Sequence, residues 1–251
     1  MKNWPGFGNG PELSHPTPTP PLVVDPYHFG TLNMNRRDFS AQLVGASLGT
    51  LALSTSTGAL AQGAAPVEGT NYVKFAQPVS PATPGKIEVV EFFWYGCPHC
   101  NAFEPALDAW QKKLPADVVF RRVPVAFRDE PFVAHQKIFY ALESMGKVEA
   151  MHRKVFYAIH NEHARLDKPD EIAAFMAKNG IDSAKFLEAY NSFSTQTKTK
   201  QAAKLAEGYK LDGVPALGIN GRYFTSGSLA GTNERMLQVT DFLIQKSRAG
   251  G

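Results

Sequence analysis

A Cys-x-x-Cys pair lies between a predicted strand and a predicted helix, and this junction constrains the fold more than any other feature of the sequence. Residues 87–94 are rich in β-branched and aromatic side chains, which predicts a largely buried strand. Cys97 and Cys100 follow, and the proline between them suits the first turn of a helix. Helical periodicity continues to about Leu114, and residues 118–125 are the next predicted strand. Strand, helix and strand in this order predict a crossover unit with parallel strands.

The hydrophobic pattern becomes helical from residue 129 to 209, after which strands return. Residues 215–219 and 222–225 are predicted strands joined by a two-residue Asn-Gly turn, and a last amphipathic helix covers residues 233–246. These segments predict an α/β fold in which a helical insertion of roughly 80 residues splits a small sheet domain. The expected parts are the first sheet segment at 62–128, the helical insertion at 129–209 and the second sheet segment at 210–251.

The first 61 residues have the composition of a leader and an export segment. Residues 1–33 hold seven of the 18 prolines and no apolar periodicity, so we interpret them as an unstructured leader or a mis-assigned start. Residues 34–61 contain Arg36-Arg37, then an uncharged stretch, then a small-x-small cleavage sequence, as cleavable export signals do. Six hydroxyl side chains in that stretch argue against the alternative, a membrane-spanning anchor. The paired arginines resemble the twin-arginine signal and also fit the general export route.

The overall composition excludes several classes of function. The chain has 251 residues, with 26 Lys and Arg against 23 Asp and Glu and a formal net charge of +3. This charge is too small for phosphate binding to drive function, so no nucleic-acid partner is expected. Two cysteines in a chain of this length also exclude a disulfide-rich scaffold.

Cys97 and Cys100 have three interpretations: half of a structural metal site, an inert surface pair, or a redox-active dithiol. Structural zinc usually takes four protein ligands, and the sequence has no second cysteine pair. We interpret the clustered histidines, His152, His160 and His163, as solvent-facing, because apolar neighbours already define the buried face of their helix. An export signal implies an oxidising compartment, and a CxxC between strand and helix is typical of redox motifs. The sequence therefore favours a redox dithiol, with no metal and no organic cofactor.

The positions of the two cysteines predict different roles. Cys97 would begin a helix, where free backbone N–H groups and the helix dipole favour an anion. His99 can add positive charge or a hydrogen bond to a Cys97 thiolate, although a histidine in a turn is commonly only solvated. A stabilised thiolate makes the disulfide easier to reduce and the protein a stronger oxidant. Cys100, one turn into the helix and more buried, is the expected resolving thiol.

Three stretches of the sequence resemble the DsbA family of thiol:disulfide oxidoreductases, which has a thioredoxin-like fold with an inserted helical domain. The stretches are Val90-Glu91-Phe92-Phe93, Cys97-Pro98-His99-Cys100 and Gly213-Val214-Pro215-Ala216. This resemblance covers nearly all of the predicted exported part. It implies a protein dithiol oxidase whose catalytic motif is formed by Cys97, Pro98, His99 and Cys100.

The resemblance also implies roles for residues outside the cysteine motif. Pro215 corresponds to a cis-proline facing the cysteines, and Val214 to a residue that offers its backbone to an extended substrate. From the sequence alone, Pro215 could instead begin an edge strand. Glu91 corresponds to a buried carboxylate and is a candidate proton relay, while Glu104 matches a second acidic position that we expect to be solvated. The basic residue near the buried carboxylate is often Lys in the family, whereas the adjacent strand here offers Arg121-Arg122.

The function implied by the resemblance is oxidation of newly exported proteins in the bacterial periplasm. The Cys97–Cys100 disulfide would pass to unfolded or partly folded proteins with free cysteines, and a DsbB-like, quinone-linked inner-membrane partner would reoxidise the pair. We expect a monomer. One alternative is a disulfide isomerase or reductase, although an isomerase usually carries a dimerisation domain, for which residues 62–86 are too short. A second alternative is a peptide-binding, chaperone-like module whose thiols are secondary.

Overall fold

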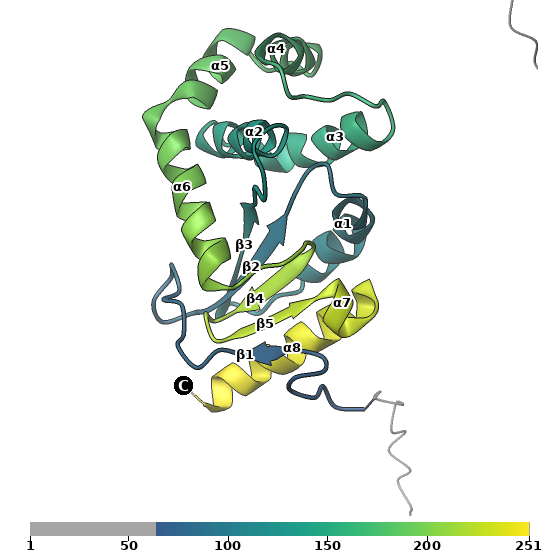
Figure 1. Ribbon diagram of the computed structural model, residues 1–251, viewed down its shortest axis with the longest axis vertical. Helices are drawn as coiled ribbons and strands as arrows, with labels where there is room; N and C mark the ends of the chain where they lie inside the picture. Colours follow the sequence, from purple (N-terminus) through teal and green to yellow (C-terminus); the bar gives the residue numbers. More distant parts are fainter. Residues whose placement is uncertain (1–63, 251) are drawn as a thin grey trace, which may run out of the picture. The chain divides into compact units, whose positions relative to one another are not determined.

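A mixed five-stranded sheet organises the computed structural model, which describes residues 64–250 (Figure 1). The predicted leader at 1–33 and the predicted export signal at 34–61 lie outside the described residues. The strand order is β1-β5-β4-β2-β3; β2 and β3 are parallel, and the other neighbouring pairs are antiparallel. The strands are β1 Val73–Lys74, β2 Ile87–Phe93, β3 Val118–Pro124, β4 Ala216–Ile219 and β5 Tyr223–Ser226.

Strand β2 is covered on both faces, which explains its nearly continuous run of apolar residues. All seven of its residues are buried. Ile87 lies opposite Val118 of the parallel strand β3, and Val89 lies opposite Ile219 of the antiparallel strand β4. The predicted parallel crossover from β2 through a helix to β3 is therefore confirmed.

Helices cover the sheet and form the insertion between β3 and β4 (Figure 1). One core lies between the sheet and α1 and α8, where Phe103 and Leu107 of α1 lie with Val89 and Leu243. A second core joins Val90 of β2 to buried residues of the insertion. The helices are α1 Pro98–Gln111, α2 Phe132–Ser144, α3 Val148–His160, α4 Pro169–Lys178, α5 Ser183–Asn191, α6 Phe193–Gly208, α7 Gly227–Ala230 and α8 Asn233–Ala249.

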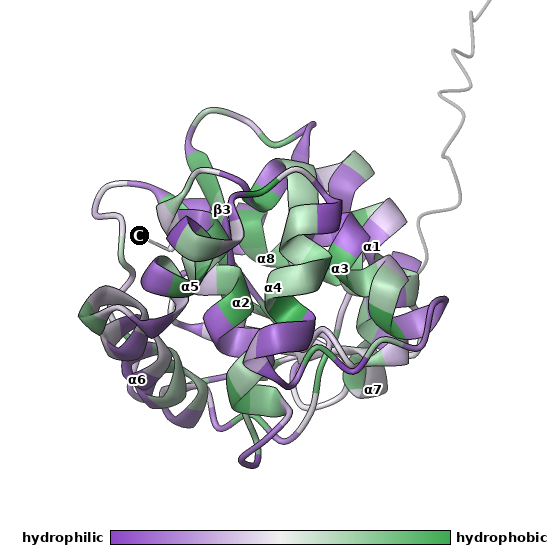
Figure 2. Ribbon diagram, turned by 90° about the horizontal axis from the view of Figure 1, so that it is seen from above, coloured by the Kyte–Doolittle hydropathy of each residue, from purple (hydrophilic) through white to green (hydrophobic). Residues whose placement is uncertain are grey.

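Two glycines and one aspartate mark helix ends inside the insertion. Gly146 and Gly180 have φ of +65° and +77°, a conformation that favours glycine and terminates α2 and α4. The carboxylate of Asp182 accepts hydrogen bonds from the N–H groups of Ala184 and Lys185, and so caps α5. Helices α2, α3 and α4 each carry both hydrophobic and hydrophilic residues (Figure 2), and hydrophobic residues of all three, such as Ile138, Val155 and Ile172, belong to one buried cluster. The insertion therefore has its own hydrophobic core, continuous with one face of the sheet.

The observed elements depart from the predicted ones at the ends of two helices and in two elements that were not predicted. Helix α8 ends at Ala249 rather than near Lys246. Helix α1 ends at Gln111 rather than near Leu114, because the chain turns at Lys112, whose N–H bonds back to the carbonyl of Trp110. Strand β1 and helix α7 were not predicted. Strand β1 has only two residues, too few to show a period of two, and pairing with β5 holds it in place.

Pro105 lies inside α1, and the helix continues past it. A proline removes the N–H that would bond to the carbonyl of Asn101 four residues earlier. In this structure Nη1 of Arg153, on α3, lies 3.4 Å from that carbonyl oxygen and donates to it. The helical insertion thus supplies a partner for the backbone group that the proline leaves free.

Candidate active site

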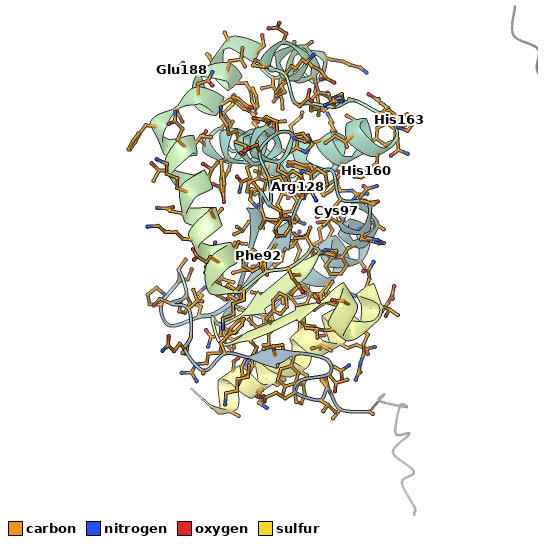
Figure 3. All side chains as sticks on the ribbon, viewed as in Figure 1. Phe92, Cys97, Arg128, His160, His163 and Glu188 are labelled. Carbon is orange, nitrogen blue, oxygen red and sulfur yellow. The ribbon has the colours of Figure 1, made fainter. Side chains whose placement is uncertain are left out.

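Cys97 caps the amino end of α1, at the point where the chain leaves β2 (Figure 3). Its backbone is extended, with φ −84° and ψ 116°, and Pro98 occupies the first turn of the helix. The N–H of Cys97 donates to the carbonyl of Trp94 at 2.9 Å, which closes the turn after the strand. The N–H of Cys100 donates to Sγ of Cys97 at 3.4 Å. A sulfur atom therefore accepts one of the free N–H groups that begin a helix.

The environment of Cys97 favours its thiolate. The side chain is nearly buried, with 7% of its surface exposed. The pKa of Cys97 is lowered to about 6, above all by hydrogen bonding with the Cys100 thiol. Burial opposes this effect, while the N–H groups of Cys100 and His99 and the positive charge of His99 reinforce it. His99 itself lies exposed beside the pair.

Cys100 has the opposite character. Its side chain is fully buried, and both cysteines are free thiols in this structure. Burial, followed by the neighbouring Cys97 sulfur, raises the pKa of the Cys100 thiol well above its ordinary value. Ionisation of Glu91 adds to this effect. One sulfur is thus a stable thiolate near the surface, and the other is a protonated thiol in the interior.

The segment before β4 faces the cysteine pair. The Val214–Pro215 peptide bond is cis, and Sγ of Cys97 lies 3.4 Å from the Val214 carbonyl oxygen, to which it donates a hydrogen bond in its thiol form. A cavity of about 430 Å³ adjoins this contact; its lining includes His99, Val214, Pro215, Ser226 and Asn233. An extended chain entering this cavity would reach the backbone of Val214 next to the reactive sulfur.

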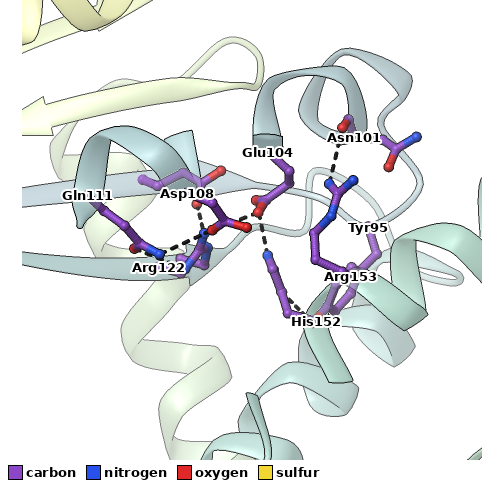
Figure 4. A network of polar contacts seen from close by, with 9 residues as sticks. Tyr95, Asn101, Glu104, Asp108, Gln111, Arg122, His152 and Arg153 are labelled. Atoms are coloured by element: carbon purple, nitrogen blue, oxygen red, sulfur yellow. Dashed lines mark hydrogen bonds and ion pairs between the residues drawn. The ribbon is translucent and has the colours of Figure 1, made fainter. Parts of the chain in front are cut away.

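Arg122 pairs with two buried carboxylates, Glu91 and Glu104, and Figure 4 shows its contact with Glu104. Nε of Arg122 lies 3.0 Å from Oε2 of Glu91, but neither Glu91 oxygen has a hydrogen-bond partner among residues 64–250. Nη2 of Arg122 donates to Glu104 at 3.1 Å and to Asp108 at 2.8 Å. Arg121 faces the other side of the strand, where it pairs with Glu88.

The two carboxylates have opposite protonation tendencies. Burial, and then the negative charge of Glu104, raise the pKa of Glu91 well above its usual range. Burial also acts to raise the pKa of Glu104, but hydrogen bonds from His152 and Arg122 outweigh it and hold that pKa below its usual value. Glu91 is therefore a neutral acid and Glu104 an anion. The prediction that Glu104 is solvated was wrong: none of its side chain is exposed.

The predicted exposure of the three histidines was wrong for one of them. His152 is buried, with 4% of its surface exposed, whereas His163 is exposed. His160 is partly buried, and its Nε2 lies 2.8 Å from the carbonyl oxygen of Tyr95. The buried face of α3 is wider than a single apolar stripe, because Phe156, four residues after His152, is also buried. That spacing was the one signal in the sequence that could have placed His152 inside.

Two further observations concern residues 64–250 as a whole. No group of three or more His, Cys, Asp or Glu side chains within this range is arranged to hold a metal ion. Among the helices of the same range, none has the length and apolar character needed to cross a bilayer.

The sequence of this chain is similar to a known protein family and to curated relatives. The DSBA-like thioredoxin domain family matches residues 88–236. The chain is 48% identical over 200 residues to the thiol:disulfide interchange protein DsbA of Pseudomonas aeruginosa, which covers 79% of this chain and 94% of the relative. It is 46% identical over 204 residues to the protein of the same name from Burkholderia cepacia, covering 79% and 95% of the two chains.

Solved structures agree with the sequence relatives. The crystal structure of Pseudomonas aeruginosa DsbA superposes with a TM-score of 0.70 at 48% identity, covering 72% of this chain and 94% of that one. The oxidoreductase DsbA from Xylella fastidiosa superposes with a TM-score of 0.68 at 32% identity, covering 73% and 98%. The predicted thioredoxin-like fold with a helical insertion is confirmed. This chain belongs to the DsbA family of thiol:disulfide oxidoreductases, and Cys97 and Cys100 stand at the spacing of its redox-active cysteine pair.

Proposed function

We propose that this protein is a periplasmic dithiol oxidase that donates a Cys97–Cys100 disulfide to newly exported proteins. The observation that carries the proposal is the contrast between the two sulfurs. The pKa of Cys97 is lowered to about 6, while burial raises the pKa of Cys100. Stabilising one thiolate of the reduced pair favours the reduced protein, so the disulfide readily accepts electrons from substrate thiols.

Electron transfer takes place in two exchanges. A substrate thiolate attacks Sγ of Cys97, the Cys97–Cys100 bond breaks, and Cys100 leaves as a thiolate that takes up a proton. The second substrate thiolate then attacks the substrate sulfur of the mixed disulfide, and Cys97 leaves as a thiolate. The substrate loses two electrons and gains a disulfide, while the cysteine pair gains those two electrons. Cys97 leaves easily because its thiolate is stable.

Proton delivery to Cys100 is the role we propose for Glu91. Its carboxyl group is buried, its pKa is raised, and its charge affects the pKa of Cys100. A neutral Glu91 can give a proton to the departing Cys100 thiolate and regain one afterwards. Arg122 stays charged throughout, so its contribution is electrostatic.

Substrate binding is the role we propose for Val214 and Pro215. The backbone of Val214 lies beside Sγ of Cys97 and adjoins the cavity next to His99. A substrate that pairs with this backbone as an added strand would be recognised through main-chain hydrogen bonds, which tolerate many sequences. Unfolded or partly folded proteins with free cysteines meet this requirement.

The redox equilibrium with glutathione tests the proposal directly. An oxidase should be reduced by millimolar glutathione and should oxidise a reduced two-cysteine peptide in a stoichiometric reaction. A disulfide that stays oxidised in millimolar glutathione would favour the alternative of a reductase or isomerase. Replacing Cys97 by Ser should abolish the reaction; full cellular activity of the Cys97→Ser variant would favour a peptide-binding module instead.

Export and reoxidation complete the proposed cycle. The exported chain would begin at Gln62, and mass spectrometry of protein from the periplasm tests this, since an earlier first residue contradicts cleavage there. Regeneration of the disulfide would use a DsbB-like, quinone-linked membrane protein. We propose that the protein acts as a monomer, and light scattering of the purified protein measures this.

A further inference from the structure

His152 lies on α3, inside the helical insertion, and contacts both segments that flank the cysteine pair (Figure 4). Its Nδ1 is 2.9 Å from the hydroxyl oxygen of Tyr95. Its Nε2 is 3.1 Å from Oε1 of Glu104. The imidazole ring also packs edge-on against Phe93 and Phe156. His152 is therefore a buried side chain with a polar partner on each ring nitrogen.

The hydrogen-bond partners fix the proton on this imidazole. Glu104 is an anion that also pairs with Arg122, and a carboxylate can only accept, so Nε2 of His152 carries the proton. Burial lowers the pKa of His152 and raises that of Tyr95, so the imidazole is neutral and the hydroxyl keeps its proton. Nδ1 then accepts from Tyr95. Tyr95 therefore donates to Nδ1 of His152, and Nε2 of His152 donates to Glu104. This arrangement gives both ring nitrogens of His152 a hydrogen-bond partner.

Tyr95 and Glu104, the two ends of this series of hydrogen bonds, both lie close to Cys97 in the sequence. Tyr95 stands in the turn between β2 and Cys97, and its carbonyl is held separately by His160 of α3. Glu104 stands on α1, one turn after Cys100. Side chains of α3 therefore hydrogen-bond to the polypeptide both before and after the cysteine pair. The pKa of Cys97 depends on how its sulfur meets the N–H groups at the start of α1, so the position of this turn matters for the chemistry.

We propose that His152 is a positioning residue for the thiol chemistry, which holds Tyr95 and Glu104 so that Sγ of Cys97 stays at the amino end of α1. Only the effect of His152 on the redox equilibrium rests on the proposed oxidase function. The geometric claim concerns the thiolate of Cys97 itself. The helical insertion thereby takes part in the chemistry of a site whose cysteines it does not contain.

Two substitutions test the proposal from the two sides of one hydrogen bond. His152→Leu removes both polar contacts, and Tyr95→Phe removes one hydroxyl while keeping the ring. The thiolate of Cys97 is followed by ultraviolet absorbance as a function of pH. We expect His152→Leu to raise the pKa of Cys97 by about half a unit, which is about a threefold change in its ionisation constant. Tyr95→Phe should act in the same direction and to a smaller extent.

Controls separate positioning from loss of structure. Tyr157→Phe removes a hydroxyl from an exposed side chain on the same helix and should leave the pKa of Cys97 unchanged. His152→Gln keeps a neutral donor and acceptor and should partly restore the wild-type pKa. A merely structural role would lower the stability of the oxidised and reduced forms equally and leave the glutathione equilibrium unchanged. We expect that equilibrium to move about threefold toward the oxidised protein in His152→Leu.

The outcomes are decisive even where one variant does not fold. If His152→Leu does not fold, Tyr95→Phe decides, because the loss of one oxygen keeps the packing. An unchanged Cys97 pKa in folded Tyr95→Phe and in folded His152→Leu would overturn the proposal. Failure of the oxidase function would appear instead in the wild-type protein, whose disulfide would resist reduction by millimolar glutathione, whatever the variants do.

Discussion

Sγ of Cys97 lies 3.4 Å from the carbonyl oxygen of Val214, although 117 residues separate them in the sequence. The chain between them forms α1, β3 and the whole helical insertion before it returns as β4. Because β4 pairs antiparallel with β2, the residues just before β4 come to the same end of the sheet as the residues just after β2. This pairing brings the sulfur of Cys97 and the peptide backbone of Val214 together.

Titration of the reduced protein should show a thiolate that forms near pH 6 rather than near pH 9. The pKa of Cys97 is lowered by the Cys100 thiol, by N–H groups and by His99. Thiolate absorbance at 240 nm measures it. The Cys97→Ser variant should lose this transition, because burial raises the pKa of Cys100 out of the same range. Persistence of the transition in Cys97→Ser would assign it to another group.

The reduced protein should be more stable than the oxidised protein at pH 8, and this order should reverse as the pH falls below about 7.4. The folded pKa of Cys97 is depressed, so its stabilisation is present at high pH and is lost as pH falls through about 6. It amounts to at most about 1.4 kcal/mol per pH unit above 6. A disulfide closing so short a loop contributes about 2 kcal/mol at all pH values. Urea midpoints of both forms at pH 5 and pH 8 measure the balance; a pH-independent difference would contradict it.

Replacing His99 by Ala should raise the pKa of Cys97 only part of the way toward 9. The variant loses the positive charge of His99 but keeps the backbone N–H groups and the Cys100 thiol, which hydrogen-bond to the sulfur. A rise of less than about one unit is expected. Thiolate absorbance gives the value, and His163→Ala, at an exposed position on the loop after α3, is the matched control. No change in the His99 variant would remove that residue from the mechanism.

Glu91→Gln should stabilise the protein, and increasingly so as the pH rises. The folded pKa of Glu91 is raised by burial and by Glu104, so the native state keeps a proton that the unfolded state loses above its ordinary pKa. That difference costs stability as the pH rises, and a neutral amide avoids it. We expect little effect near pH 4 and a gain on the order of 1 kcal/mol at pH 7. Urea unfolding at both pH values measures it.

A second glutamate on the same strand is the control for that prediction. Both carboxylate oxygens of Glu88 accept hydrogen bonds from Arg121, and one also accepts from the N–H of Ala82. A Gln at position 88 cannot satisfy all of these donors, so Glu88→Gln should lose stability. If both variants gained stability equally, burial of Glu91 beside Glu104 would not be the cause.

The sequence by itself determined the elements whose signals are local. The apolar run at β2, the cysteine motif that starts α1, and the Asn-Gly turn between β4 and β5 each depend on residues near one another in the chain. The ends of α2 and α4 lie next to Gly146 and Gly180, whose positive φ is a conformation that glycine adopts at little cost. The different characters of Cys97 and Cys100 followed from their places relative to one helix end.

Only the tertiary structure decided which polar side chains are buried. Glu104 and His152 come from two separate helices, and each is tolerated in the interior because they hydrogen-bond to each other. Arg122 also pairs with Glu104, and Tyr95 with His152. A sequence read one segment at a time assigns both to solvent, since an unpaired charge is too costly to bury. Likewise, the register of β2 against β3 set Arg122 beside Glu91. The cysteine motif could be recognised from the sequence alone. The buried polar residues around it could not, because their hydrogen-bond partners come from distant segments of the chain.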